Sequence, residues 1–235
     1  MRPSSRRAAW ALVAVIAGLP AGAGDIPGAV IVLEAAPGGG RRDARSAPPR
    51  FVLLEDGQVF VGGTAHLEAG RLEKAEAQAL RKRARAAGKL PGIGPRLELG
   101  GDPSLTLRLR LLEGDPVEIA TAGDPSQAPP RLEPLASLLA DLLRFDHPSL
   151  RPYTPSGYAM VVREGRLVGG CRPWGFTFPI AAALSSPRTV SAAEAAGWPT
   201  GAVPASVCAA DADPSDPASK RYVVTLRPLL PGEQP

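Results

Sequence analysis

The chain has 235 residues, of which 44% are hydrophobic and 21% charged, and its formal net charge is +4 at pH 7. This length can bury the core of one domain or of two small ones, so folding does not depend on disulfides. Three of the 27 Lys and Arg residues and none of the 23 Asp and Glu residues precede residue 24, which leaves 24 minus 23, or +1, for the remainder. The basic composition therefore gives poor support to nucleic-acid binding.

Residues 1–23 have the pattern of an export signal. Three arginines precede an apolar stretch at residues 8–19, and Ala-Gly-Ala at 21–23 matches a cleavage site. The apolar stretch is shorter than the roughly 20 residues that span a bilayer. We therefore expect cleavage after Ala23 and a periplasmic or extracellular protein. A retained leader that anchors the chain to the membrane is the alternative.

The region after the leader starts with a strand, a hairpin and a helix. Residues 29–33 are predicted to form a buried strand, and residues 51–63 a hairpin that turns at Asp56-Gly57. A helix is predicted over 71–87, where Gly88 and Pro91 follow as a stop signal. Its apolar face is predicted to consist of Leu72, Ala75, Ala79, Leu80, Ala86 and Ala87.

The same order then recurs. Residues 104–122 alternate leucines with polar residues, turn near Gly114 and return as a second strand, and a leucine-rich helix is predicted over 134–145. A third hairpin is predicted over 157–170, with Glu164-Gly165 at its turn. The β-branched stretch 221–226 predicts a last strand, antiparallel to residues 158–162.

These elements predict an α+β fold with antiparallel hairpins and two main helices packed on one face. Hairpin followed by helix forms a degenerate repeat, stronger in the first two units than in the third. Residues 24–146 are expected to form the α+β domain. Residues 147–235 are expected to supply a C-terminal hairpin, an irregular Pro- and Trp-rich segment and the last strand, packed on the first part.

Over residues 29–146 the chain resembles a family of uncharacterised secreted bacterial domains built as strand, DG hairpin, helix, hairpin and helix. The residues that carry the resemblance are mostly at turns and strand edges: Asp56, Gly57, Val59, Gly62, Gly70, Asp102 and Thr106. The resemblance implies secretion and this order of elements, and it implies no activity.

The chain has two cysteines, Cys171 and Cys208. An even number in an exported protein favours a disulfide, for which loop entropy predicts on the order of 3 to 4 kcal/mol of stabilisation. Two buried free thiols are the alternative. Their spacing excludes a CxxC redox or metal motif.

No specific catalytic signature is present: G-x-S-x-G, H-E-x-x-H and GK[ST] are all missing from the sequence. Only two histidines are available for acid–base chemistry, His66 and His147. An envelope hydrolase that uses either histidine with an aspartate is therefore an alternative function rather than the leading one. No catalytic residue, metal site or cofactor is predicted.

Aromatic residues concentrate around the two cysteines, and Trp174, Phe176 and Trp198 are the candidate binding residues, with Phe178 beside them. Such a cluster can line a groove for a ligand, or it can be the core that a Gly- and Pro-rich segment needs. The leading hypothesis is a non-enzymatic binding module whose partner is an envelope protein or a small ligand, and nucleic acid is not expected. A structural spacer or an N-terminally anchored envelope protein is the remaining alternative.

Overall fold

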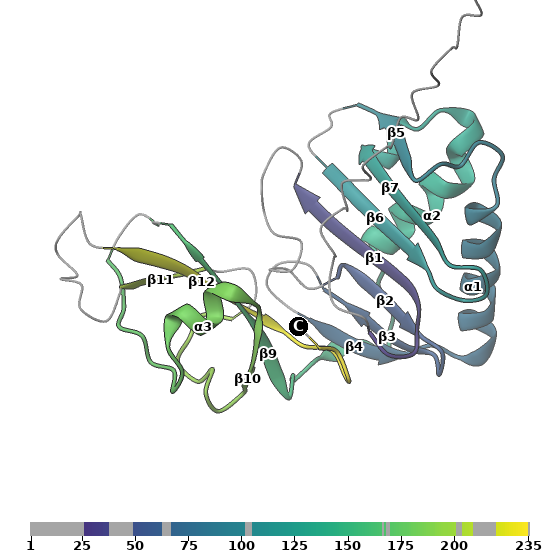
Figure 1. Cartoon of the computed structure of the whole chain (residues 1–235). Helices are drawn as coiled ribbons and strands as arrows, with labels where there is room; N and C mark the ends of the chain where they lie inside the picture. Colours follow the sequence, from purple (N-terminus) through teal and green to yellow (C-terminus); the bar gives the residue numbers. More distant parts are fainter. Residues whose placement is uncertain are drawn as a thin grey trace, which may run out of the picture.

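The computed structural model describes residues 26–37, 49–62, 67–101, 105–165, 167, 170–200, 204–208 and 220–234. The predicted signal at residues 1–23 lies outside this part of the chain. The described residues have a mixed α/β fold, with two β-sheets and three α-helices, in which sheet predominates (Figure 1). None of the helices among these residues is long and apolar enough to cross a membrane.

The first sheet has eight strands in the order β5-β7-β6-β1-β2-β3-β4-β8. Neighbouring strands are antiparallel except β5 and β7, which are parallel. The strands are β1 (Ala29–Pro37), β2 (Phe51–Leu54), β3 (Gln58–Val61), β4 (Glu68–Arg71), β5 (Arg96–Gly100), β6 (Leu105–Leu111), β7 (Val117–Gly123) and β8 (Arg151–Pro152).

The first two of the three predicted hairpins are confirmed as β2–β3 and β6–β7. At the first turn Gly57 has a φ of 85°, which glycine adopts at low cost. The Asp56 carboxylate accepts a hydrogen bond from the backbone N–H of Gln58 at 2.9 Å and pairs with Arg71 at 2.7 Å. The bond from Gln58, assisted by Arg71, lowers the pKa of Asp56 below its usual value. The turn is therefore fixed by both backbone and side chain.

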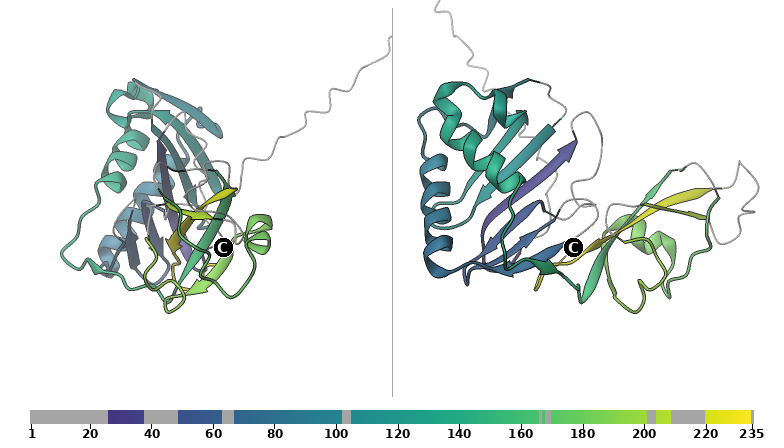
Figure 2. Two further views of the ribbon diagram at one scale, coloured as in Figure 1. Left: turned by 90° about the vertical axis from the view of Figure 1, so that its left-hand side faces the viewer. Right: turned by 180° about the vertical axis from the view of Figure 1, so that it is seen from behind.

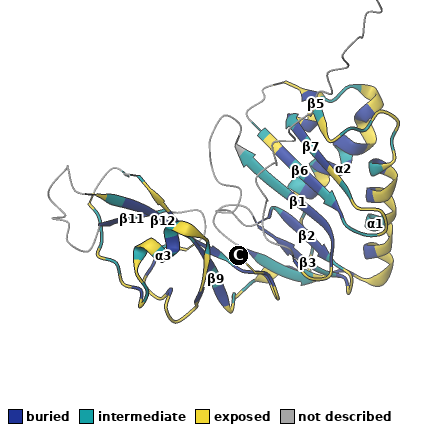
Figure 3. Ribbon diagram, in the orientation of Figure 1, coloured by how far each residue is buried: buried dark blue, intermediate teal, exposed yellow. Residues whose placement is uncertain are grey.

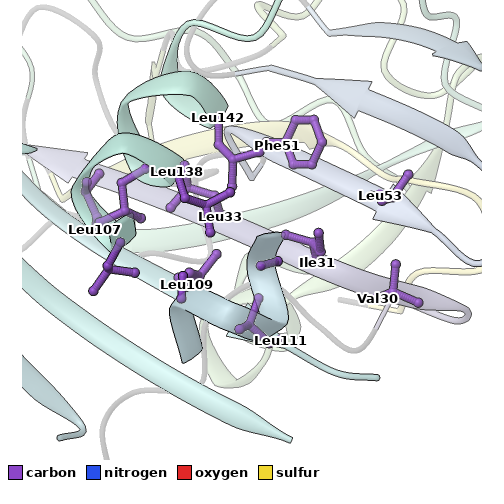
Figure 4. Packing of buried hydrophobic residues seen from close by; sticks show 14 of the residues in the cluster. Val30, Ile31, Leu33, Phe51, Leu53, Leu107, Leu109, Leu111, Leu138 and Leu142 are labelled. Carbon is purple, nitrogen blue, oxygen red and sulfur yellow. The ribbon is translucent and has the colours of Figure 1, made fainter. Parts of the chain in front are cut away.

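Two helices cover one face of this sheet, α1 (Lys74–Gly88) and α2 (Glu133–Leu143). The alternation predicted for β6 is confirmed, because Leu107, Leu109 and Leu111 are buried beneath the helices. Figure 4 shows these leucines with Leu138 and Leu142 of α2 and with the side chains of β1 and β2. We call this set of buried residues the helix-side core.

The predicted apolar face of α1 is right in part. Leu72 and Ala87 are buried and Leu80 packs against the helix-side core. Ala75, Ala79 and Ala86 are exposed, and the helix buries Ala77 and Ala84 as well. Alanines occur all round this helix, so their positions alone do not identify one face. Because the buried side chains are those of alanine, the helix backbone lies close to the sheet. A Cβ on Gly88 would lie only 2.8 Å from Leu111 Cδ1 of β6.

The second sheet has four strands in the order β10-β9-β12-β11. They are β9 (Gly157–Glu164), β10 (Arg188–Ser191), β11 (Ala205–Cys208) and β12 (Arg221–Pro228), and the short helix α3 (Ile180–Ser185) contacts β9. The predicted pairing of the last strand is confirmed, with Val224 opposite Val162. Of the third predicted hairpin, the first arm is present as β9, which pairs with β12 and β10. Residues 166, 168 and 169 of its second arm lie outside the described residues.

The chain returns from the second sheet to the uncovered face of the first. Leu230 follows β12 and packs with Ile26, Val32 and Phe60 in a cluster on the face opposite the helices. The turn is held by a buried ion pair in which Arg227 donates to both carboxylate oxygens of Glu233, at 2.7 and 2.9 Å. The Glu233 carboxylate also accepts from the backbone N–H of Leu230. We call Arg227, Leu230 and Glu233 the C-terminal clamp.

The clamp lies where the two sheets meet. The second sheet extends from the β4 end of the first, and the C-terminus lies between them (Figures 1 and 2). The Tyr153 hydroxyl, between β8 and β9, donates to the Leu229 carbonyl at 3.2 Å. Burial raises the pKa of Tyr153, and the charge of Glu233 adds to this. The burial colouring of Figure 3 shows dark strand interiors and an exposed outer face of α1.

Candidate functional site

The structure brings the predicted aromatic residues together in the core of the second sheet. The Phe176 and Trp198 rings lie 4.5 Å apart between centroids, and Trp174 lies 5.0 Å from Phe176 and 6.4 Å from Trp198. Phe178 joins them at 5.7 Å from Trp174. These separations are those of favourable aromatic pairs. All three predicted binding residues thus belong to one cluster.

The four rings divide into two buried and two partly exposed members. Phe176 and Trp198 are buried, whereas Trp174 and Phe178 are half-buried. The indole N–H of Trp174 donates to the Phe178 carbonyl at 2.5 Å, which closes the segment between them. A ligand at this surface would therefore meet the carbon atoms of the indole rather than its N–H.

Two arginines lie over the rings at the two ends of the cluster. The Arg172 guanidinium is 4.1 Å from the Trp198 ring centroid, and the Arg188 guanidinium is 5.3 Å from that of Phe178. These are cation–π distances. Five side chains thus follow one another in space, each beside the next. We call this set the aromatic row: Arg172, Trp198, Trp174, Phe178 and Arg188. The prediction of binding residues omitted both arginines. Their positions in the sequence do not indicate that they stack on the rings.

The aromatic row is tied to the sheet by a disulfide and by backbone pairing. Cys171 and Cys208 are joined, with their Cα atoms 5.3 Å apart, as the sequence predicted. The next residue, Arg172, bridges to β11: its N–H donates to the Ser206 carbonyl at 2.9 Å and its carbonyl accepts from Cys208 at 3.0 Å. One end of the row is therefore held covalently as well as by hydrogen bonds.

The histidines do not share this cluster within the described part of the chain. His66 lies outside the described residues. His147 follows α2 and lies beside the first sheet, where its ring packs 6.4 Å from that of Phe145. Its Nε2 is 3.5 Å from a carboxylate oxygen of Glu76 on α1, and its Nδ1 is 2.8 Å from Ser149 Oγ. The acidic neighbour is thus a glutamate, where an aspartate was predicted.

The order Glu76, His147, Ser149 has the composition of a hydrolase triad, but the serine is engaged. Its backbone N–H points to His147 Nδ1 at 3.2 Å, so that nitrogen is an acceptor and the neutral ring carries its proton on Nε2. Ser149 Oγ accepts from the backbone N–H of Arg71 at 3.0 Å. A Cβ on Gly70 would lie only 2.5 Å from that oxygen. Ser149 thus links β4 to the turn after α2 through hydrogen bonds, which is a structural role.

Replacing Ser149 by alanine tests this assignment. We expect a loss of about 1 kcal/mol in the free energy of unfolding, because the Arg71 N–H loses its acceptor, and hence a melting temperature about 2 to 4 °C lower. Gly70→Ala should cost more, since its Cβ would overlap Ser149 Oγ. Thermal melting measures both variants. Labelling of Ser149 by a fluorophosphonate would contradict a purely structural role.

The cationic surface of α1 is largely neutralised within the fold. Arg83 pairs with Asp141 at 2.6 Å, and Arg85 pairs with Glu113 at 2.7 Å. Arg81 donates to the backbone carbonyls of Leu54 and Glu55. These contacts favour a solvated helix face over a binding patch for the basic residues of α1. In the described ranges, His, Cys, Asp and Glu side chains form no group of three that could hold a metal ion.

Comparison of the chain with models of protein families, with curated proteins and with solved structures finds no match. Functional inference therefore depends on the geometry of the described residues.

Proposed function

We propose that this chain is an exported, non-enzymatic binding module that uses the aromatic row to bind another protein of the envelope. The observation that carries the proposal is the half-burial of Trp174 and Phe178, which leaves apolar ring surface exposed between Arg172 and Arg188. Aromatic and arginine side chains are the residues most enriched where proteins bind one another. The buried Phe176 and Trp198 support this surface from beneath.

Export is supported by two independent features. Residues 1–23 have the pattern of a cleavable signal, and disulfides persist mainly in oxidising compartments. We therefore place the protein in the periplasm or outside the cell. The resemblance to secreted domains of strand, DG hairpin, helix, hairpin and helix is part of the same proposal.

We also propose that the first sheet arose from a duplicated hairpin–helix unit. The pair β2–β3 precedes α1, and the pair β6–β7 precedes α2. Both helices contribute to the helix-side core, which is what two equivalent units on one sheet would produce.

Site-specific cross-linking tests the binding surface. Thr177 is exposed between Phe176 and Phe178, so a photoreactive benzoylphenylalanine at this position would face a partner on the aromatic row. In the producing cell we expect irradiation to give one discrete adduct. Gln78, exposed on α1, is the matched control position and should give none.

A second variant links the adduct to the rings. Trp174→Ala should abolish the Thr177 adduct while the purified protein retains a cooperative melting transition. The same adducts from Thr177 and Gln78, or no adduct from either, would count against binding at the aromatic row.

The hydrolase alternative has weaker support. Glu76 supplies a carboxylate beside His147, but Ser149 packs against the backbone of β4, where a substrate carbonyl would have to approach. A nucleophile must leave about 3 Å of free space for the reacting atom. The spacer alternative predicts no adduct at Thr177.

A further inference from the structure

We infer that the partner segment bound by the aromatic row is acidic, with carboxylates placed on both sides of an apolar stretch. This inference rests on the proposed function, because it names the chemistry that the same surface recognises. It is carried by the two arginines that end the row and by the absence of carboxylates beside them among the residues that the structure describes.

In the described part of the chain, both arginines have backbone carbonyls as their hydrogen-bond acceptors. Arg172 donates to the Gly197 carbonyl at 3.0 Å, and Arg188 donates to the Ala182 carbonyl at 3.2 Å. Within the described residues, no carboxylate lies within 4.0 Å of either guanidinium. A guanidinium has five N–H donors, so each retains donors for a ligand.

The acidic side chains that the structure describes in and around the second sheet have other partners. Glu194 accepts from the backbone N–H and the hydroxyl of Ser191, both at 2.8 Å. Glu164 pairs with Lys220 at 2.6 Å, and Glu233 is buried against Arg227. The positive charge at the two ends of the row is therefore available to a partner.

The rings make the two charges more specific than an ordinary basic surface. Stacking on Trp198 and Phe178 orients both guanidiniums, which reduces the side-chain entropy lost when a carboxylate binds. Between them lie the half-buried faces of Trp174 and Phe178. A ligand that contacts both arginines and the rings between them would have an apolar centre and an anionic group toward each end.

The strand β10 places one of these arginines at a sheet edge. Arg188 is its first residue, and β10 is the outermost strand beside β9. An extended segment can align with such an edge while its side chains reach the adjoining rings. This favours a peptide segment over a compact anion.

Intrinsic fluorescence provides a reporter confined to the row. The chain has three tryptophans, Trp10, Trp174 and Trp198. Cleavage after Ala23 would remove Trp10, and Trp10→Phe removes it from an uncleaved chain, so in either form tryptophan emission comes only from the row. The probe is a nonapeptide with two glutamates at each end of a proline–valine centre. Matched peptides carry glutamine or lysine in place of glutamate.

We expect saturable quenching by the glutamate peptide, about tenfold weaker binding of the glutamine peptide and no binding of the lysine peptide. Arg172→Gln combined with Arg188→Gln should weaken the glutamate peptide about tenfold, whereas Arg131→Gln, an exposed arginine on the first part of the chain, should not. Binding should also weaken as salt rises.

Three results would overturn the inference. The first is equal binding of the glutamate and glutamine peptides, which would leave an apolar surface and the proposed function intact. The second is quenching by none of the peptides, in which case the Thr177 cross-link decides separately whether the row binds a protein. The third is tighter binding of heparin than of the glutamate peptide, which would identify an anionic polysaccharide instead.

Discussion

Replacing Glu233 by glutamine is expected to lower the free energy of unfolding by about 3 to 5 kcal/mol, the largest effect of any single substitution considered. The side chains of Arg227 and Glu233 are 2% and 0% exposed, and both carboxylate oxygens accept from the guanidinium. Removing the negative charge leaves the buried Arg227 charge without this carboxylate. A neutral amide also cannot replace both accepted bonds. Denaturant unfolding followed by circular dichroism gives the free energy.

Glu164→Gln is the matched control. Glu164 pairs with Lys220 at 2.6 Å in the same sheet, but these side chains are 60% and 58% exposed. Exposed pairs contribute about 0 to 1 kcal/mol, so this variant should unfold almost as the parent does. Equal losses from Glu164→Gln and Glu233→Gln would show that the buried pair contributes nothing special.

The double variant Arg227→Met with Glu233→Met separates charge from packing. Replacing a buried pair by apolar residues is often close to neutral, so the double variant should recover much of the stability lost in Glu233→Gln.

Deleting residues 229–235 removes Leu230 as well as Glu233, and it should prevent stable folding rather than remove one activity. A deleted chain that stays soluble with an unchanged melting transition would contradict this.

Replacing both Cys171 and Cys208 by alanine should cost about 3 to 4 kcal/mol, because the bond closes a loop between positions 37 apart. The loss should be concentrated in the second sheet, because the bond joins Cys208 of β11 to Cys171, the residue just before Arg172. Hydrogen exchange resolved by peptide should show faster exchange in β11 and in residues 172–178 than in β1 and β6.

Reduction provides the control for this prediction. Dithiothreitol should destabilise the parent chain by a similar amount and leave the double alanine variant unchanged. If reduction and substitution both leave exchange in residues 172–178 unaltered, the bond does not hold the aromatic row.

The first sheet was largely predictable from sequence because its signals are local. Asp56-Gly57 dictates a turn, and the alternating leucines of β6 show which residues face the core. Strand β5 was missed because its five residues alternate only weakly, and its parallel partner β7 follows it after an intervening strand. The face of α1 was predicted only in part, because its two leucines mark the buried side but alanine is too evenly distributed along the helix.

The second sheet was less predictable because its contacts are distant in sequence. The pairing of β9 with β12 was recognised from matching composition, but β10 and β11 are short and are preceded in the sequence by prolines. The sequence Ser191-Ala-Ala-Glu194 has the spacing of a helix capping box, and its hydrogen bonds form, yet residues 192–197 form turns rather than a helix. The stacking of Arg172 and Arg188 has no sequence signal at all.

The C-terminal clamp also bears on when the protein can become folded. Leu230 shares its cluster with Val32, so one face of the first sheet is completed by residues from the other end of the described chain. During synthesis this face stays open until Glu233 has emerged. Contacts of such long separation form late in folding. The strands that emerge first can pair with one another, but this face of their sheet stays uncovered until Leu230 is present, which is compatible with the proposed export of an unfolded chain.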